Sequence, residues 1–214
     1  MHIRESTRRS RESGPGDFRI DLAKMYAIKL SRPNPGRGEK ALFWLFNSEF
    51  HVVACYRYGR FADRVHLKHP LLGIAALASH RFWNRWITHI DHFEIHPHSR
   101  IGPGLLVMHR HGIILNAEIG QNCVIHQNVT IGQHAAGGDQ RAPRIGNGVW
   151  IGPGAIVTGP IVIGDGATIS AGTVLTKDIP PRCLVAGNPG RVIAQDYDNA
   201  ALINFVMPDS ASFP

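Results

Sequence analysis

The stretch IGNGVWIGPGAIVTGPIVIGDGATISAGTVL, residues 145–175, places an aliphatic residue at every sixth position. The same spacing governs residues 95–131, and one segment, 133–144, separates the two series. An amphipathic helix repeats its apolar residues every three or four positions, so a period of six excludes it. The chain thus contains thirteen six-residue units (hexads), and the first residue of each is aliphatic: Ile95, Ile101, Val107, Ile113, Ile119, Ile125, Ile131, Ile145, Ile151, Val157, Ile163, Ile169 and Leu175.

This period predicts a mainly β solenoid. Each hexad supplies a short strand whose opening residue points to the axis, and a corner where Gly, Asn or Asp accepts the required backbone angles. Three hexads close one coil, and stacked coils bury the aliphatic column continuously. Glycine usage agrees, because 17 of the 23 glycines lie between residues 95 and 193. The alternative is a β-sandwich with accidental spacing, but the length of the series favours the solenoid.

Upstream of the repeats the pattern becomes helical. Apolar residues recur at three- and four-residue spacing over residues 39–65 and again over 67–90, and Pro70 fits the first turn of a helix. Asp17 fits the N-cap of a short helix that ends at Leu30. We therefore expect an α-helical N-terminal region ahead of the solenoid.

The composition shifts divide the chain into four parts. Residues 1–40 hold a basic tail, a short helix and the linker SRPNPGRGE, and residues 41–93 form the helical region. Residues 94–193 form the repeat domain, and residues 194–214 form an acidic C-terminal tail without a motif. We thus expect one repeat domain, preceded by a basic tail and a helical region and followed by an acidic tail.

Composition excludes several classes of protein. With 43% hydrophobic and 18% charged residues the chain is expected to fold, and its longest apolar run, residues 70–79, is about half of a membrane span. The net charge of +7 suggests nucleic acid, but residues 94–193 carry seven basic and five acidic residues, without interleaved aromatics. Three cysteines without a CxxC pair form neither a disulfide framework nor a zinc ribbon. We expect a cytoplasmic protein with no nucleic-acid partner and no membrane span.

Three segments carry a resemblance to a known family: EIHPHSRIGPGLLVMHRHGIIL (94–115), GQHAAGGDQRAPRIG (132–146) and IPPRCLVAGNPGRVI (179–193). They resemble the left-handed β-helix (hexapeptide-repeat) acyltransferases, in the serine acetyltransferase branch that includes exopolysaccharide O-acetyltransferases. The resemblance implies a left-handed parallel β-helix, a homotrimer or a dimer of trimers, and acetyl-CoA as co-substrate. The implied reaction is direct transfer of the acetyl group to a hydroxyl.

Such a transfer needs a base, because a neutral alcohol attacks a thioester too slowly, and a histidine suits that role near pH 7. His109 matches the catalytic histidine of the family motif DHxTG, which reads Met108 to Gly112 here. Glu94 matches the family aspartate in DIHP that orients the base. The resemblance therefore assigns His109 and Glu94 as the catalytic residues.

The same resemblance implies where the substrates bind. Gly152, Ala171 and Gly172 match the positions beside the pantetheine arm, and Lys177 and Arg191 match the end that meets the adenine and phosphates. In the family, acetyl-CoA lies between neighbouring subunits, along the coils that follow the base.

The acceptor site departs from the serine enzymes. The family holds the amino acid with an Asp before the base and an Arg-His pair in the loop, and these places read Met108 and Arg141-Ala142 here. Asp139 and Arg141 are candidate acceptor contacts on a loop expected to project beside His109. His111, at a usually inward fifth position, is expected to be buried beside the base. The acceptor stays open between L-serine and a saccharide hydroxyl.

Two further classes compete with this interpretation. The solenoid fold also hosts zinc enzymes whose signature includes a His-x4-His pair, but no two histidines are five residues apart here, so we expect no metal. The other histidines, including His96, His98, His126 and His134, are expected to be structural or to lie at exposed turns. A non-catalytic trimeric scaffold is the second alternative, and the retained His109 and Glu94 argue against it.

Overall fold

The computed structural model describes residues 17–32, 34–133 and 141–208, in which four helices precede a run of short strands. The helices are α1 (Asp17–Leu30), α2 (Arg37–Phe46), α3 (Ser48–Lys68) and α4 (Pro70–Asp91), with the short α5 (Ala200–Ile203) near the C-terminus. The strands are β1 (Glu94–Ile95), β2 (Arg100–Ile101), β3 (Leu106–Val107), β4 (Ile114–Leu115), β5 (Glu118–Ile119), β6 (Val124–Ile125), β7 (Thr130–Gly132), β8 (Arg144–Ile145), β9 (Trp150–Ile151), β10 (Ile156–Thr158), β11 (Val162–Ile163), β12 (Thr168–Ile169), β13 (Val174–Leu175), β14 (Leu184–Ala186) and β15 (Arg191–Ala194).

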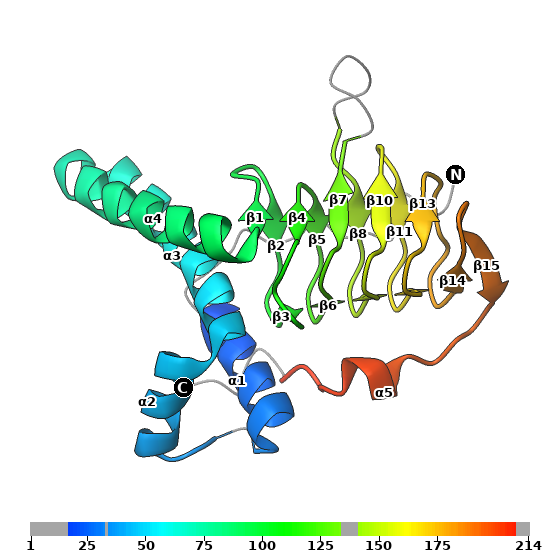
Figure 1. The fold of residues 1–214 in the computed structure, drawn as a ribbon, viewed down its shortest axis with the longest axis horizontal. Coiled ribbons are helices and arrows are strands. Elements are labelled where there is room, and N and C mark those ends of the chain that lie inside the picture. The colour runs from blue at the N-terminus through cyan, green and yellow to red at the C-terminus, as the bar shows by residue number, and fades with distance from the viewer. Residues whose placement is uncertain (1–16, 33, 134–140, 209–214) are drawn as a thin grey trace.

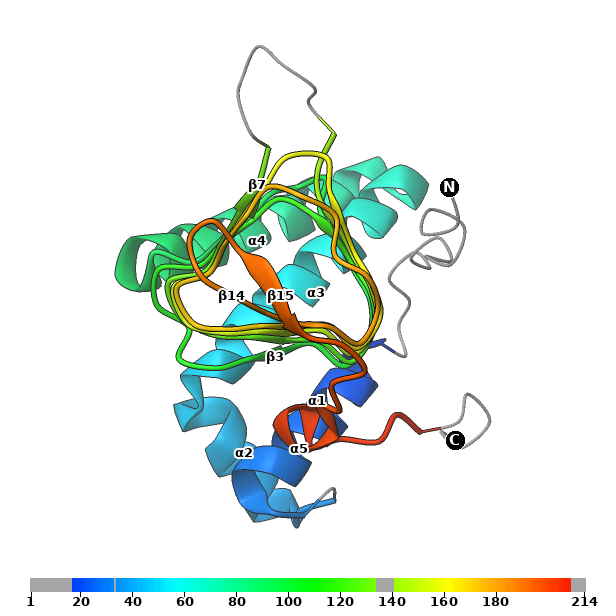
Figure 2. The ribbon, with the colours of Figure 1, turned by 90° about the vertical axis from the view of Figure 1, so that its right-hand side faces the viewer.

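The strands form three sheets that the chain visits in rotation. Sheet A has the order β1-β4-β7-β10-β13, sheet B the order β2-β5-β8-β11, and sheet C the order β3-β6-β9-β12-β14-β15. Neighbours pair in parallel except β14 and β15, which pair antiparallel. Seen along the stack, the successive turns of chain superimpose as a triangle (Figure 2). The predicted short parallel strands and the helical N-terminal region are confirmed.

One prediction about the hexads is wrong. In sheet A, Ile95 lies beside Leu115, which lies beside Ile131, so Leu115 and not Ile113 takes the inward position of the fourth hexad. The corner before β4 is therefore longer than in the other coils, and the corner after it is shorter. Ile113 and Leu115 are both fully buried aliphatic residues, which is why counting in sixes did not reveal the shift.

The break in the repeats lies where it was predicted. β7 ends at Gly132 in sheet A and β8 begins at Arg144 in sheet B, so the break separates a strand of sheet A from the next strand, which belongs to sheet B. Residues 134–140, including Asp139 and His134, lie outside the described part of the chain.

The helices differ from the prediction at one point. The helix expected over residues 39–65 is two helices, because Asn47 has an extended backbone (φ −85°, ψ 110°) that ends α2. Its side chain then accepts a hydrogen bond from the backbone N–H of Phe50 at 2.7 Å and caps α3. The expected second helix is α4, with Pro70 in its first turn, and the short helix to Leu30 is α1, which begins at Asp17 itself. The linker that was expected over residues 31–39 is shorter, because α2 begins at Arg37.

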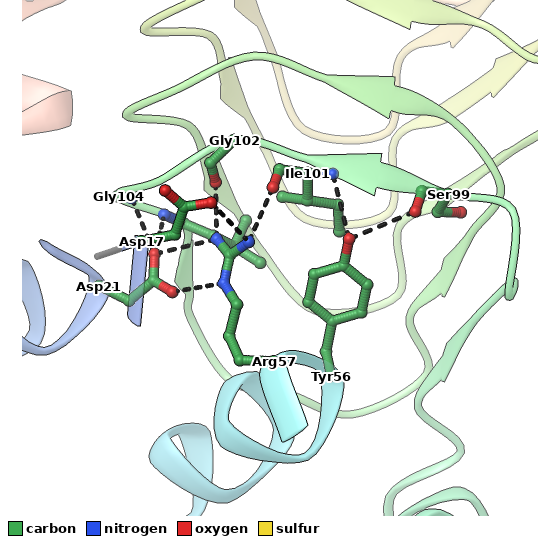
Figure 3. Close-up of polar contacts among 9 residues, drawn as sticks. Asp17, Asp21, Tyr56, Arg57, Ser99, Ile101, Gly102 and Gly104 are labelled. Carbon is green, nitrogen blue, oxygen red and sulfur yellow. Dashed lines mark hydrogen bonds and ion pairs between the residues drawn. The ribbon is translucent and has the colours of Figure 1, made fainter. Parts of the chain in front are cut away.

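Helices α1 and α3 cover the first coil through buried charges (Figure 3). Arg57 of α3 donates to Asp21 of α1 (Nε to Oδ2, 2.7 Å) and to the carbonyl oxygens of Ile101 and Gly102, at 2.8 and 2.7 Å. Tyr56 Oη accepts from the Ile101 N–H at 3.1 Å. Since β2 is the edge of sheet B, these side chains satisfy backbone groups that an edge strand leaves unpaired.

The C-terminal segment returns along the coils towards α1 (Figure 1). Asn199 Nδ2 donates to the Gly148 carbonyl at 2.9 Å, and Asn122 Nδ2 donates to the Phe205 carbonyl at 2.9 Å. Lys24 of α1 lies 6.0 Å from the Phe205 ring centroid. Residues 199 and 205 of the tail thus contact both the coils and α1. Among the described helices, none combines the length and apolarity needed to cross a bilayer.

Candidate active site

His109 lies on the widened corner between β3 and β4. Its backbone is in the left-handed region at φ 55°, which is uncommon for a residue with a side chain. The carbonyl of His109 accepts a hydrogen bond from the His111 N–H at 2.7 Å, which closes a tight turn. The His109 side chain is exposed, so its imidazole is open to a substrate.

The last residue of α4 holds this corner in place. Asp91 is buried and its Oδ2 lies 2.7 Å from Arg110 Nε, while its carbonyl accepts from the Gly112 N–H at 3.0 Å. Gly112 has φ 67°, and a Cβ there would lie 2.4 Å from Asn128 Oδ1, so a side chain at this position would be strained and would displace Asn128. The sequence analysis missed Asp91, because nothing in its local pattern separates it from the other polar residues of α4.

His126 lies on the next coil beside the candidate base. Its ring centroid is 6.5 Å from that of His109 and 4.8 Å from that of Trp150. Burial lowers the pKa of His126, and the positive charges of His109 and Lys29 lower it further. A neutral His126 therefore lies next to His109 at pH 7. The sequence analysis treated His126 as a turn residue and missed this contact.

Glu94 and His111 are placed differently from each other. Glu94 is exposed on β1, and its Cα lies beside that of Ile114 on the following coil. In the described part of the chain no hydrogen bond or ion pair joins Glu94 to His109. His111 was expected to be buried, and this is wrong, because the widened corner carries it outward: the side chain is exposed, with its ring 5.6 Å from that of His92.

The corners between sheets C and A form a column that begins at His109. Gly152, Ala171 and Gly172 follow β9 and β12 in this column. Backbone hydrogen bonds join the corners, from Gly154 N–H to the Gln127 carbonyl at 3.0 Å and from Gly172 N–H to the Pro153 carbonyl at 2.8 Å. We name it the His109 corner column.

The glycines of this column have separate structural reasons. A Cβ on Gly152 would lie 2.8 Å from the Ala171 nitrogen, so Gly152 is needed for close stacking of coils. Gly172 has φ 66° with no heavy atom within 4 Å of its virtual Cβ, and Ala171 beside it is exposed. A ligand can therefore approach the backbone closely at Ala171 and Gly172.

The remaining predicted residues lie elsewhere. Arg141 and Lys177 are exposed at corners between sheets A and B, a different corner of the triangle from His109. Arg191 is exposed on β15. Met108 is partly buried and packs against the apolar core. One chain therefore groups His109 with Gly152, Ala171 and Gly172, and separates them from Arg141 and Lys177.

The described residues contain no group of three or more His, Cys, Asp or Glu side chains arranged to hold a metal ion. The three cysteines are free and buried, and burial raises the pKa values of Cys55 and Cys123 to about 12 and about 11. The thiols of Cys55 and Cys123 are therefore protonated near pH 7. Of the titratable side chains on the first corner of the column, the imidazoles of His109 and His111 are exposed, and His109 is the one that the resemblance names as the candidate base.

Comparison with known proteins agrees with this arrangement. Residues 142–177 match the family model "Bacterial transferase hexapeptide (six repeats)". The chain is 37% identical over 164 residues to a serine acetyltransferase of Synechococcus elongatus, covering 75% of this chain and 64% of the relative. It is 30% identical over 203 residues to a serine acetyltransferase of Escherichia coli, covering 94% of this chain and 70% of the relative. The chain belongs to the serine acetyltransferase family. It spans about two thirds of the length of these family members, which are acyltransferases.

Solved structures of the family have the same fold. The serine acetyltransferase of Neisseria gonorrhoeae in complex with serine has a TM-score of 0.63 and 31% identity, covering 83% of this chain and 67% of that chain. The serine acetyltransferase of Brucella abortus in complex with coenzyme A has a TM-score of 0.65 and 27% identity, covering 84% and 67%. The chain therefore shares its fold with serine acetyltransferases that have been solved with serine and with coenzyme A.

Proposed function

We propose that this chain is an acetyl-CoA-dependent O-acetyltransferase with a left-handed β-helix, and that L-serine is its first candidate acceptor. The observation that carries the proposal is the exposed imidazole of His109 on a widened corner, at the start of a column that leaves Ala171 and Gly172 open to a ligand. Family membership supports it, since the relatives are named for serine acetylation and one was solved with coenzyme A.

In the proposed reaction His109 acts as a general base. Its imidazole removes the proton of the acceptor hydroxyl as the oxygen attacks the thioester carbonyl. When the tetrahedral species collapses, the carbon–sulfur bond breaks and the imidazolium returns the proton to the coenzyme A thiolate. The acetyl group passes directly to the acceptor, and no covalent enzyme intermediate forms. Backbone N–H groups of the corner column, such as that of Ala171, can stabilise the thioester oxygen as it gains charge.

Glu94 is proposed to orient the base. A carboxylate that accepts from the imidazole fixes its tautomer and stabilises the imidazolium. Both side chains are exposed, and Glu94 lies on β1, whose Glu94 N–H donates to the Ile113 carbonyl at the end of the His109 corner at 2.8 Å. The neutral His126 beside His109 avoids a second positive charge when His109 takes up a proton.

We further propose that neighbouring copies complete the site in a trimer. The corners between sheets A and B carry Arg141 and Lys177, while His109 lies at the corner between sheets C and A. Within one chain these are two different corners of the triangular coil, so Arg141 and Lys177 do not lie on the same corner as His109. Three copies packed about a common axis can set one copy's A–B corners against the next copy's His109 corner column. Lys177 and Arg141 would then face the coenzyme A and the acceptor bound to the neighbour.

A saccharide hydroxyl is the second candidate acceptor, and Met108 favours it. Met108 occupies the place where the serine enzymes carry an Asp, and it packs against the core. A thioether gives the ammonium group of an amino acid no charge-assisted hydrogen bond. A sugar has no ammonium group, so its binding does not require a charged partner at this position.

The test measures thiol release from acetyl-CoA with L-serine or with nucleotide sugars as acceptor. Loss of a general base reduces turnover by about 10²- to 10⁴-fold, so we expect this loss in His109→Ala and unchanged turnover in His98→Ala, a matched exposed histidine. Serine-dependent release supports the serine acceptor, and release with only a sugar replaces it by the second candidate. If no alcohol stimulates release by the folded protein, the proposal is overturned in favour of a scaffold.

Subunit complementation tests the shared site. His109→Ala and Arg141→Ala are each expected to be poorly active. If one copy supplies His109 and its neighbour supplies Arg141, refolding the two variants together restores wild-type geometry at roughly a quarter of the interfaces. Recovered activity supports the shared site. Mixed oligomers with no more activity than either variant show that the site lies within one chain.

A further inference from the structure

A cavity lies between α3, α4 and the first coil, and one of its lining residues, His92, has its ring centroid 5.6 Å from that of His111 on the His109 corner. Its volume is about 760 Å³, within the range of small-molecule sites. None of residues 108–112 lines it, and nothing in the proposed reaction uses it. It therefore needs an explanation of its own.

The floor of the cavity is apolar. Val52 and Cys55 of α3, Ile87 of α4 and Phe93 after it are all buried and all line the cavity. Cys55 adds no charge, because burial raises the pKa of its thiol to about 12. An apolar body of a ligand would be shielded from water on this floor.

The rim of the cavity is cationic. Arg60 of α3 and Arg81 and Arg85 of α4 line it, with Asp63 as the one acidic residue of the lining. Asp63 lies 3.7 Å from Arg60, a long ion pair with a half-exposed carboxylate. In the described part of the chain neither Arg81 nor Arg85 forms an ion pair. Two guanidinium groups one helical turn apart repel each other unless an anion lies between them.

A histidine adds a neutral polar group to this rim. His80 of α4 packs against Gly59 of α3, where a Cβ would lie 2.5 Å from its Nε2, so glycine makes room for the ring. Burial lowers the pKa of His80, Arg81 lowers it further, and Asp63 opposes the shift. A neutral imidazole is able to donate one hydrogen bond to an anionic group without adding to the charge of the rim.

We propose that this cavity binds an amphiphilic anion, with its apolar body on the floor and its carboxylate or phosphate between Arg81 and Arg85. The apolar floor alone fits any hydrophobic molecule, and the cationic rim alone fits any anion. Their combination selects a molecule that has both parts. A free amphiphile and an anionic lipid headgroup with the start of its acyl chain share this chemistry.

Titration calorimetry on the full chain tests the site with octyl phosphate below its micellar concentration. Saturable binding with one site per chain is expected, and inorganic phosphate is expected to bind at least about tenfold more weakly because it buries no apolar surface. Octylammonium is the charge-reversed control and is expected not to bind. Equal binding of octyl phosphate with inorganic phosphate, or with octylammonium, overturns the proposal.

Variants identify the cavity as the binding site. Arg81→Gln with Arg85→Gln is expected to weaken octyl phosphate binding by about tenfold or more, since both hydrogen-bonding charges are lost. Arg37→Gln with Arg100→Gln removes two exposed arginines elsewhere and is expected to change binding less than twofold. Asn84→Phe fills the cavity from an exposed position and is expected to abolish binding. Unchanged binding in the Arg81/Arg85 variant or in Asn84→Phe, with the circular dichroism spectrum retained, overturns the proposal.

Vesicles distinguish the two sources of the anion. Co-sedimentation with phosphatidylcholine vesicles that contain phosphatidic acid, lost on competition with octyl phosphate, supports a lipid headgroup. Octyl phosphate binding without vesicle binding supports a free amphiphile. Equal co-sedimentation of wild type and the Arg81/Arg85 variant shows that lipids bind elsewhere, and it overturns the lipid source.

Discussion

The coils and their junction with the helices are stabilised by opposite means. The interior of the coils is a column of aliphatic residues with exposures near zero, among them Ile119, Ile125 and Ile151. The junction buries Asp21, Lys24 and Arg57, which are charged residues that need partners. A repeating column gains stability from each added coil, whereas the junction must satisfy one particular edge of a sheet. The two regions should therefore respond differently to substitution.

Arg57→Ala is expected to be the most destabilising change, at about 4 to 5 kcal/mol in the free energy of unfolding. It leaves Asp21 buried without its ion-pair partner and removes the guanidinium donors to the Ile101 and Gly102 carbonyls. Urea unfolding monitored by circular dichroism measures the loss. Arg60→Ala, one turn further along α3 with a long ion pair, is the control and is expected to change stability by less than about 1 kcal/mol.

A double variant sharpens this result. Arg57→Met with Asp21→Leu removes both charges together, so its loss is expected to be smaller than the sum of the two single losses. Additive losses would show that the two side chains act independently, and the junction would then differ from the coils only in composition.

Ile151→Ala tests the column and is expected to lower stability by about 3 kcal/mol, because it leaves a cavity among tightly packed side chains. Ile151 is fully buried in β9, where it lies beside Ile125 and Ile169 in sheet C. Ile156→Ala, on the next strand but 40% exposed, is the matched control. A loss at Ile156 as large as at Ile151 would contradict the inward column.

The difference between the regions also explains what the sequence could predict. The hexads repeat locally, so the strands, the break after Gly132 and the position of His109 at a corner were predictable from spacing, whereas its role as base came from the family resemblance. The junction joins Asp21 to Arg57 and Lys24 to Asn122, pairs far apart in the chain that no short pattern links. The shift from Ile113 to Leu115 was hidden because both residues are aliphatic and buried.

The candidate site divides in the same way. His109, Gly152, Ala171 and Gly172 share a corner column because corners recur with the repeat. The partners that hold the His109 corner were not predictable, since Asp91 comes from the end of a helix and His126 and Trp150 from later coils. Spacing along the repeat thus predicts position, while contacts between elements depend on the folded structure.

Lys24→Met is expected to change the pH dependence of stability by an amount on the order of 3 kcal/mol. Burial lowers the pKa of Lys24 to about 8 from 10.5, with Cys123 and Asp21 opposing the shift. The unfolded chain then binds the proton more tightly than the folded chain. The contribution of Lys24 to the free energy of unfolding therefore increases as the pH rises from about 8 to 10.5, and the same contribution is lost as the pH is lowered through this range. Urea unfolding of both proteins across this range measures it. Parallel curves would show that Lys24 titrates normally.

Asn47→Ala is the smallest expected effect, at about 1 kcal/mol, because it removes the cap of α3 and no contact with the coils. Asn47→Ser keeps a side-chain oxygen for the Phe50 N–H and is expected to stay within a few tenths of a kcal/mol of wild type. Thermal unfolding measures both. A larger loss in Asn47→Ala would mean that the break between α2 and α3 also sets how α3 presents Arg57 to the first coil, and the local cap would then belong to the junction.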